Sequence, residues 1–163
     1  MSTWPDFRPQ PILERLTRRG IDFVIIGGYA AVLHGSARLT QDLDLCFGTD
    51  RANLTALGEA LLEMEARLFG VTEDVPFVPD APTLARVELL TLQTSLGKLD
   101  LMTHPAGAPE YRKLRDGADR YEIGGFLVQV ASVADLKAMK RAAGRPKDLA
   151  DIAELEAIEQ LRG

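Results

Sequence analysis

The chain has 163 residues, a length that fits one folded domain. Its hydrophobic share of 46% and charged share of 26% are typical of soluble globular proteins and exclude a largely disordered chain. The formal net charge of -5 excludes a protein whose whole surface coats nucleic acid, because phosphate contacts need clustered Lys and Arg.

Residue types further restrict the location of the protein and the metal sites it can build. The sequence shows neither a secretion signal nor an apolar stretch of about 20 residues, so we expect a cytoplasmic protein with no membrane partner. Its one cysteine, Cys46, cannot form an internal disulfide. One cysteine and two histidines are too few ligands for a usual Cys/His zinc site. Any bound metal must be held mainly by carboxylates.

The first part of the chain predicts a helix, a buried strand and a second helix. Apolar residues at helical spacing predict a short helix over Pro11–Arg19. Phe23–Ile26 is a largely β-branched apolar run, which predicts a buried strand that enters a tight turn at Gly27-Gly28. Tyr29–Leu33 is expected to begin the second helix.

The middle of the chain predicts strands around one long helix. Asp42–Phe47 alternates polar and apolar residues, which is the period of a strand with one buried face. Leucines and alanines at helical spacing predict an amphipathic helix over Asn53–Leu68, and the proline-containing acidic stretch Thr72–Pro82 is expected to be a loop. Val87–Leu92 and Leu99–Met102 are predicted to form a hairpin.

The last part predicts one more strand and two helices. The strand is Phe126–Val130, and the helix over Val133–Ala143 has Ser132 as its N-cap. Gly144 ends that helix, and Pro146 fits the first turn of the next one. The apolar stripe of this final helix comprises Leu149, Ile152, Leu155 and Ile158. Strands and helices are interleaved along the chain, so the predicted fold class is α/β.

The glycines after the first strand are a candidate phosphate-binding turn. Gly27 and Gly28 have no Cβ, so the backbone there can approach a phosphate, and the N-terminus of the following helix favours anions. A glycine turn between a strand and a helix also occurs for purely structural reasons. The turn alone leaves both interpretations open.

Three aspartates on predicted strands are the candidate metal ligands. Asp42 and Asp44 occupy positions i and i+2 of one strand, so their side chains point the same way, with Cα atoms roughly 6 to 7 Å apart. A divalent cation would offset their repulsion, and Mg²⁺ in particular prefers carboxylates, water and phosphate oxygens. Asp100 could join them if its strand lies beside theirs, and three carboxylates would hold one or two metal ions. The alternative for each aspartate is a solvated strand face.

Taken together, these pieces resemble the DNA polymerase β-like nucleotidyltransferase superfamily, whose pattern is a Gly-Gly or Gly-Ser turn, an Asp-x-Asp strand and a later third aspartate. A narrower likeness, to the small bacterial branch with the AbiE-type and MenT-type toxins, rests on Gly27-Gly28-Tyr-Ala-Ala-Val-Leu-His34-Gly35 and Arg38-Leu-Thr40-Gln-Asp42-Leu-Asp44. The resemblance extends from about Phe23 to Leu155. It implies a mixed β-sheet flanked by helices, in a single domain over residues 1–163 with its core at about 21–131 and a helical C-terminal part at about 132–163.

The resemblance implies an enzyme that transfers a nucleoside monophosphate from an NTP such as ATP to an acceptor and releases pyrophosphate. Asp42, Asp44 and Asp100 would be its catalytic residues and would bind Mg²⁺ or Mn²⁺. The acceptor would be a tRNA 3′ end or a protein hydroxyl, and the protein would be a toxin with a cognate antitoxin. The alternatives are a catalytically silent nucleotide- or partner-binding module of the same fold and an antibiotic-modifying nucleotidyltransferase.

Basic and polar residues complete the predicted nucleotide site. Lys137, Lys140 and Arg141 lie on one side of their helix by spacing, so this face could meet the triphosphate, or it is a solvated basic face. By the resemblance, Arg38 and Thr40 belong to the rim of the site. Arg38 could bind a phosphate or pair with a nearby acid.

Overall fold

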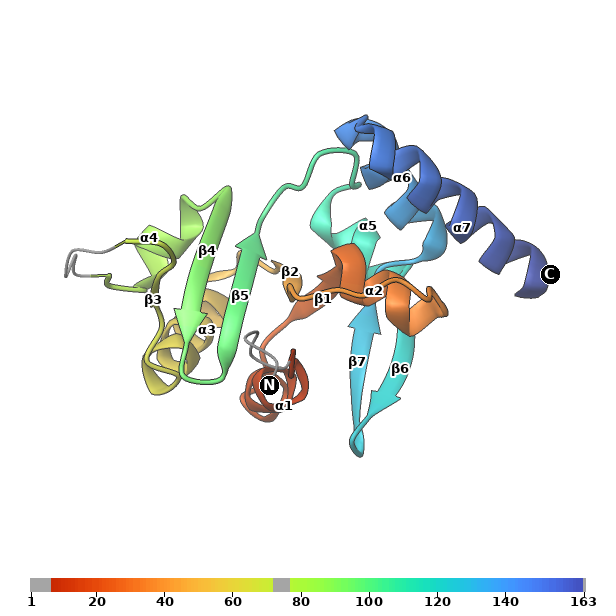
Figure 1. Ribbon diagram of the computed structural model, residues 1–163. Helices are drawn as coiled ribbons and strands as arrows, with labels where there is room; N and C mark the ends of the chain where they lie inside the picture. The colour runs from red at the N-terminus through yellow and green to blue at the C-terminus, as the bar shows by residue number, and fades with distance from the viewer. Residues whose placement is uncertain (1–6, 72–76, 163) are drawn as a thin grey trace.

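The computed structural model describes residues 7–71 and 77–162, in which a mixed seven-stranded β-sheet carries helices on both faces (Figure 1). The strands lie in the order β3-β4-β5-β2-β1-β7-β6. Their bounds are β1 Phe23–Ile26, β2 Asp44–Phe47, β3 Arg67–Leu68, β4 Leu89–Thr94, β5 Gly97–Met102, β6 Asp119–Ile123 and β7 Phe126–Val130. The helices are α1 Gln10–Arg18, α2 Gly27–His34, α3 Arg51–Glu63, α4 Ala81–Ala85, α5 Tyr111–Asp116, α6 Val133–Ala143 and α7 Pro146–Arg162. The predicted α/β class is confirmed.

The centre of the sheet brings two of the aspartates together. β1 runs antiparallel to β2, and β2 runs parallel to β5. In the parallel pair Asp44 lies directly opposite Asp100, and the Asp100 N–H donates a 2.9 Å hydrogen bond to the Leu43 carbonyl. The expected neighbourhood of these two strands is therefore confirmed.

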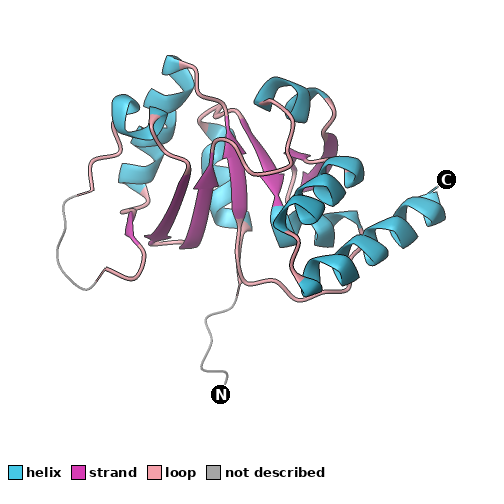
Figure 2. Ribbon diagram, turned by 90° about the horizontal axis from the view of Figure 1, so that it is seen from above, coloured by secondary structure: helices cyan, strands magenta, loops and turns pink. Residues whose placement is uncertain are grey.

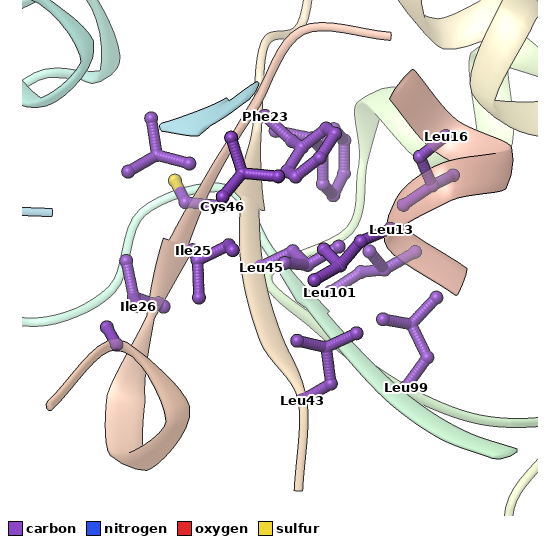
Figure 3. Packing of buried hydrophobic residues seen from close by; sticks show 14 of the residues in the cluster. Leu13, Leu16, Phe23, Ile25, Ile26, Leu43, Leu45, Cys46, Leu99 and Leu101 are labelled. Atoms are coloured by element: carbon purple, nitrogen blue, oxygen red, sulfur yellow. The ribbon is translucent and has the colours of Figure 1, made fainter. Parts of the chain in front are cut away.

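The hydrophobic core fixes which way the aspartates point. Leu45 of β2 and Leu101 of β5 are buried beside Leu13 of α1 (Figure 3). Each fully buried leucine contributes roughly 1.5 to 3 kcal/mol to folding. Because successive side chains of a strand alternate between faces, Asp44 and Asp100 point to the face away from α1.

The two faces of the sheet are covered unequally. On the face of the aspartates, α6 and α7 lie toward the end of the sheet that carries β1, β7 and β6 (Figure 2). The other end, formed by β3, β4 and β5, has α3 and α4 on the opposite face (Figure 2). On the aspartate face of this end, no helix formed by residues 7–71 or 77–162 covers the strands.

Several predicted elements have their expected bounds, and others are shifted. Phe23–Ile26, Phe126–Val130 and Val133–Ala143 agree with the structure, and Ser132 caps the last of these by accepting a 3.1 Å hydrogen bond from the Asp135 N–H. The helix predicted over Asn53–Leu68 is wrong at its end, since α3 stops at Glu63. Glu65 takes a positive φ of 53°, and the chain then turns into β3.

Other differences arise where the apolar signal is weak. The strand predicted from Asp42 begins only at Asp44, so Asp42 lies in the preceding loop. Leu149 is not part of the buried stripe of α7, because its side chain is 68% exposed. Sequence patterns did not indicate β6, α4 or α5, which are short and largely exposed.

Part of the predicted loop Thr72–Pro82 cannot be compared, because residues 72–76 lie outside the described ranges. Its last two residues belong to α4, which begins at Ala81 because the Asp80 carboxylate caps it through the Thr83 N–H at 2.8 Å. Among the described helices, none combines the length and the apolar character that crossing a membrane requires.

Candidate active site

Asp44 and Asp100 form the centre of the candidate site. Burial raises the pKa of Asp44, the hydrogen bond and charge of Asp100 and the charge of Asp42 raise it further, and Lys98 lowers it, with a result of about 7. Asp100 Oδ1 is buried and has no hydrogen-bond partner among the described residues. A buried carboxylate oxygen without a partner is unfavourable, so this pair favours a cation or a proton donor.

Asp42 takes part in the site through a lysine. Its side chain is 49% exposed, and its Oδ1 accepts a 3.1 Å hydrogen bond from Lys98 Nζ. Among the described residues, no three His, Cys, Asp or Glu side chains are close enough to form a ready metal site. Lys98 is thus the cation that Asp42 holds in this structure. Sequence analysis missed Lys98, although the i, i+2 spacing to Asp100 places both on one strand face.

The glycine turn is built against the Asp44 carboxylate. Gly27 has a φ of 72°, and a Cβ added to it would lie 2.2 Å from Asp44 Oδ2. A Cβ on Gly28 would lie 2.9 Å from Thr40 Oγ1. Both positions therefore need glycine for close approach, and the first also for its backbone conformation.

A cleft of about 430 Å³ opens beside the turn. It lies between the β1–α2 turn, residues 36–42 and the two C-terminal helices. Of the predicted site residues, those that line it are Gly27, Gly28, Arg38, Thr40, Asp42, Asp44 and Lys140. Asp100 is not among the lining residues, but it adjoins the cleft through its pairing with Asp44.

Carboxylates of α7 hold the basic residues of the cleft. Arg38 forms an ion pair with Asp151, which favours the acid-pairing alternative for this arginine. Lys140 Nζ lies 3.0 Å from Asp151 Oδ2 and 3.6 Å from Asp148 Oδ1. Both basic side chains therefore already face an anionic group in the position where a phosphate would compete.

The structure divides the predicted basic face of α6. Lys137 forms an ion pair with Glu159 and Arg141 lies 3.6 Å from Glu156, so both are directed to α7 and neither lines the cleft. Arg145 and Lys147, which sequence analysis did not assign to the site, line it instead. The signal in the sequence that could have identified them is their position just after Gly144, the glycine that ends α6.

Asp148 organises the start of α7. Its Oδ2 accepts hydrogen bonds from the Arg145 backbone N–H at 3.0 Å and from Arg145 Nε at 2.9 Å. The hydrogen bonds and charge of Arg145 lower the pKa of Asp148 from 3.8 to about 2. The carboxylate closes the first turn of the helix as a capping group.

Asp148→Asn is expected to lower the melting temperature at pH 7 by about 2–4 °C, the usual effect of one lost cap in a chain of this size. Because the folded-state pKa is lowered, this stabilisation is complete above about pH 4 and is lost as the pH falls toward 2. Thermal unfolding at pH 7 and pH 3 measures it, with exposed Glu156→Gln on α7 as control. A difference that does not shrink with acid would contradict this role.

His34 has a structural position at the end of α2. It is buried, and its Nε2 lies 2.7 Å from the Ala131 carbonyl, which it contacts as a donor. Its Nδ1 lies 2.9 Å from the Tyr121 hydroxyl and 3.0 Å from Arg162 Nη1. These contacts attach the end of α7 to α2 and β6.

Comparisons with known proteins agree with this geometry. The family model described as "Nucleotidyl transferase AbiEii toxin, Type IV TA system" matches residues 12–161. No curated protein sequence matches the chain.

Similar solved structures share the fold. The lincosamide antibiotic adenylyltransferase LnuA, bound to lincomycin, has a TM-score of 0.59 at 16% identity, over 91% of this chain and 94% of that one. ANT(2'')-Ia in complex with adenylyl-2''-tobramycin has a TM-score of 0.53 at 20% identity, over 93% and 90% of the two chains. An antigenic nucleotidyltransferase-like protein from Paracoccidioides brasiliensis has a TM-score of 0.51 at 19% identity, over 93% and 73%.

Proposed function

This chain belongs to the AbiEii nucleotidyltransferase toxin family, and we propose that it transfers a nucleoside monophosphate from an NTP to a hydroxyl acceptor at the Asp44–Asp100 pair. The observation that carries the proposal is the placement of Asp44 opposite Asp100 and against the Gly27 turn, at the edge of a cleft with basic residues. The family description supports a toxin with an antitoxin partner. The cytoplasmic location stays a prediction from the sequence and fits the use of an NTP as substrate.

The carboxylates fit a divalent metal ion. Asp100 Oδ1 is buried without a partner, the pKa of Asp44 is raised by burial and by like charge, and Asp42 already holds a cationic group. Asp42, Asp44 and Asp100 would hold Mg²⁺, with Asp42 exchanging Lys98 for the ion. When bound, the ion supplies neutralisation of the charge on the transferring phosphoryl group.

The cleft would bind the triphosphate. Gly27 and Gly28 leave the backbone accessible at the start of α2, where N–H groups and the helix dipole favour anions. Arg38 and Lys140 would exchange their Asp151 partner for phosphate oxygens, which carry more negative charge. Thr40 packs against Gly28 and shapes the rim.

The reaction replaces the phosphoanhydride bond between the α- and β-phosphates of the NTP with a phosphoester bond to the acceptor. The acceptor oxygen bonds to the α-phosphorus, the bond from this phosphorus to the oxygen bridging to the β-phosphate breaks, and pyrophosphate leaves. The acceptor proton passes to a carboxylate. We assign this step to Asp100, whose carboxylate adjoins the cleft through its pairing with Asp44.

A transfer assay tests the proposal. Protein with Mg²⁺ and each α-labelled NTP is incubated separately with total RNA and with protein extract, and both pyrophosphate release and label on the acceptor are measured. Label on either acceptor, lost in Asp44→Asn, is the expected result. NTP binding with no transfer to RNA or protein would favour a silent nucleotide-binding module.

Lys140→Ala is expected to raise the dissociation constant for NTP roughly 10-fold, the loss of one charge-assisted contact. Lys137→Ala, on the same helix but paired with Glu159, is expected to change it less than about 2-fold. Calorimetric titration with NTP and Mg²⁺ measures both. If Lys137→Ala and Lys140→Ala weakened NTP binding equally, the result would instead favour the prediction from the sequence that one face of α6 binds the triphosphate.

Antibiotic modification is the second candidate, because two structures similar to this chain are enzymes seen with lincomycin and with adenylylated tobramycin. Growth of cells expressing the protein on these two antibiotics tests it. Resistance that disappears in Asp44→Asn would establish this activity.

A further inference from the structure

The uncovered end of the sheet carries a row of polar and aromatic side chains next to the candidate active site. We call Arg67, Phe69, Thr91, Gln93 and Lys98 the wing surface. Thr91 lies opposite Asp100, Gln93 lies opposite Lys98 on one side and Arg67 on the other, and the Phe69 N–H donates a 3.0 Å hydrogen bond to the Thr91 carbonyl. Opposite residues of paired strands share a face, so these side chains lie on the same face as Asp100.

The wing surface is accessible to a ligand. Arg67 and Phe69 are exposed and the other three members are partly exposed, whereas Leu92 and Leu99 on the opposite face are completely buried. No helix from residues 7–71 or 77–162 lies over this face (Figure 2). Among the described residues, no helix therefore packs over the side chains of this row.

Phe69 and Lys98 link the wing surface to the carboxylates. The Phe69 side chain is 49% exposed, although a phenyl ring gains by burial. Lys98 Nζ lies 4.8 Å from the Phe69 ring centroid and 3.1 Å from Asp42 Oδ1. One ammonium group thus contacts both an exposed aromatic ring and a candidate metal ligand.

The position of the wing surface matches the place of the acceptor. In phosphoryl transfer the attacking and leaving oxygens lie roughly in line across the phosphorus. The Gly27 turn follows β1, and the cleft that would hold the leaving pyrophosphate also lies on that side of the aspartates. β4 and β3 lie on the other side of β5, so the attacking hydroxyl would approach over the wing surface.

We propose that the wing surface binds the 3′ end of a single-stranded RNA acceptor, with a terminal nucleobase stacked on Phe69. This inference rests on the proposed nucleotidyl transfer. Single strands bind to proteins by stacking bases on aromatic rings beside cationic side chains, and Phe69 with Arg67 and Lys98 provides that combination. A protein acceptor carries no phosphodiester backbone for Arg67 and Lys98 to contact, so the two basic side chains beside the ring favour a nucleic acid.

A binding measurement tests the stacking directly. A short single-stranded RNA with 2-aminopurine at its 3′ end is titrated with the full chain without NTP, and the fluorescence of the base is recorded. Stacking on Phe69 quenches this fluorescence. Phe69→Ala is expected to weaken binding about 10-fold and to remove the quenching, while Phe69→Trp retains both.

Controls separate stacking from a folding defect. Leu127→Ala, which removes a side chain that is 60% exposed on β7 at the other end of the sheet, is expected to bind the RNA like the original chain. Melting temperatures of all variants are compared, and Phe69→Leu replaces Phe69→Ala if the latter unfolds. Lys98→Met and Arg67→Gln are each expected to reduce the salt dependence of RNA binding.

The outcomes distinguish this inference from the proposed function. Transfer to RNA with a KM for RNA that rises about 10-fold in Phe69→Ala supports both. Transfer to RNA that Phe69→Ala leaves unchanged, or transfer to protein alone, overturns the inference and leaves the nucleotidyl transfer intact. Quenching through Phe69 without transfer to any acceptor supports the RNA surface and overturns the proposed function.

Discussion

Asp44→Asn is expected to reduce nucleotidyl transfer by at least about 10³-fold, since the variant would lose a proposed ligand of a metal ion that would supply several kcal/mol of charge stabilisation. The change preserves the shape of the side chain at the position opposite Asp100. It also removes a carboxylate that burial and two neighbouring aspartates disfavour. The variant should therefore melt at the same or a higher temperature than the original chain when no metal is present.

Thermal shift with Mg²⁺ separates this prediction from a general loss of structure. Metal that binds the folded state raises the melting temperature, so Mg²⁺ should stabilise the original chain clearly more than Asp44→Asn. Asp116→Asn, at an exposed position at the end of α5, is the matched control for both measurements. Normal transfer by Asp44→Asn would show that Asp44 is not a catalytic residue.

Gly27→Ala is expected to reduce transfer nearly as much, although it leaves every charged group in place. The new Cβ would lie 2.2 Å from Asp44 Oδ2, closer than nonbonded atoms approach, so the carboxylate must move from its place beside Asp100. The φ of 72° adds backbone strain of about 1 kcal/mol for a residue other than glycine. Transfer and thermal unfolding are measured together.

Gly20→Ala provides a control with the same strain and no collision. Gly20 has a φ of 68°, and a Cβ there would meet no atom within 4 Å. It should lower the melting temperature by about 2–4 °C and leave transfer unchanged. If Gly27→Ala lost only as much activity as Gly20→Ala, the close packing of the turn against Asp44 would have no catalytic importance.

The sequence predicts the centre of this fold well because strand alternation and the glycine turn are local signals. Phe23–Ile26 and the alternation around Asp44 and Asp100 identify strands, and the parallel pairing of β2 with β5 bears out the neighbourhood inferred for them. Local patterns fail to predict an element when neither of its faces is clearly more buried than the other. β6 is an edge strand with few buried side chains, and its pattern therefore resembles a loop.

The partners of charged residues are less predictable, because they depend on packing between distant segments. Helical spacing places Lys137 with Lys140, but only Lys140 lines the cleft, since Glu159 of α7 holds Lys137. Arg38 pairs with Asp151, a residue far along the chain. No local pattern shows which acid a basic residue meets across two helices.

The parallel pairing of β2 with β5 also has a consequence for when activity can arise during synthesis. A parallel pair needs a long connection, and here α3, β3, α4 and β4 lie between Asp44 and Asp100. A nascent chain that has emerged from the ribosome only as far as β4 carries one aspartate of the pair and none of α6. We expect such a chain to be unable to transfer nucleotides, so the proposed activity can arise only after β5 and α6 have been translated.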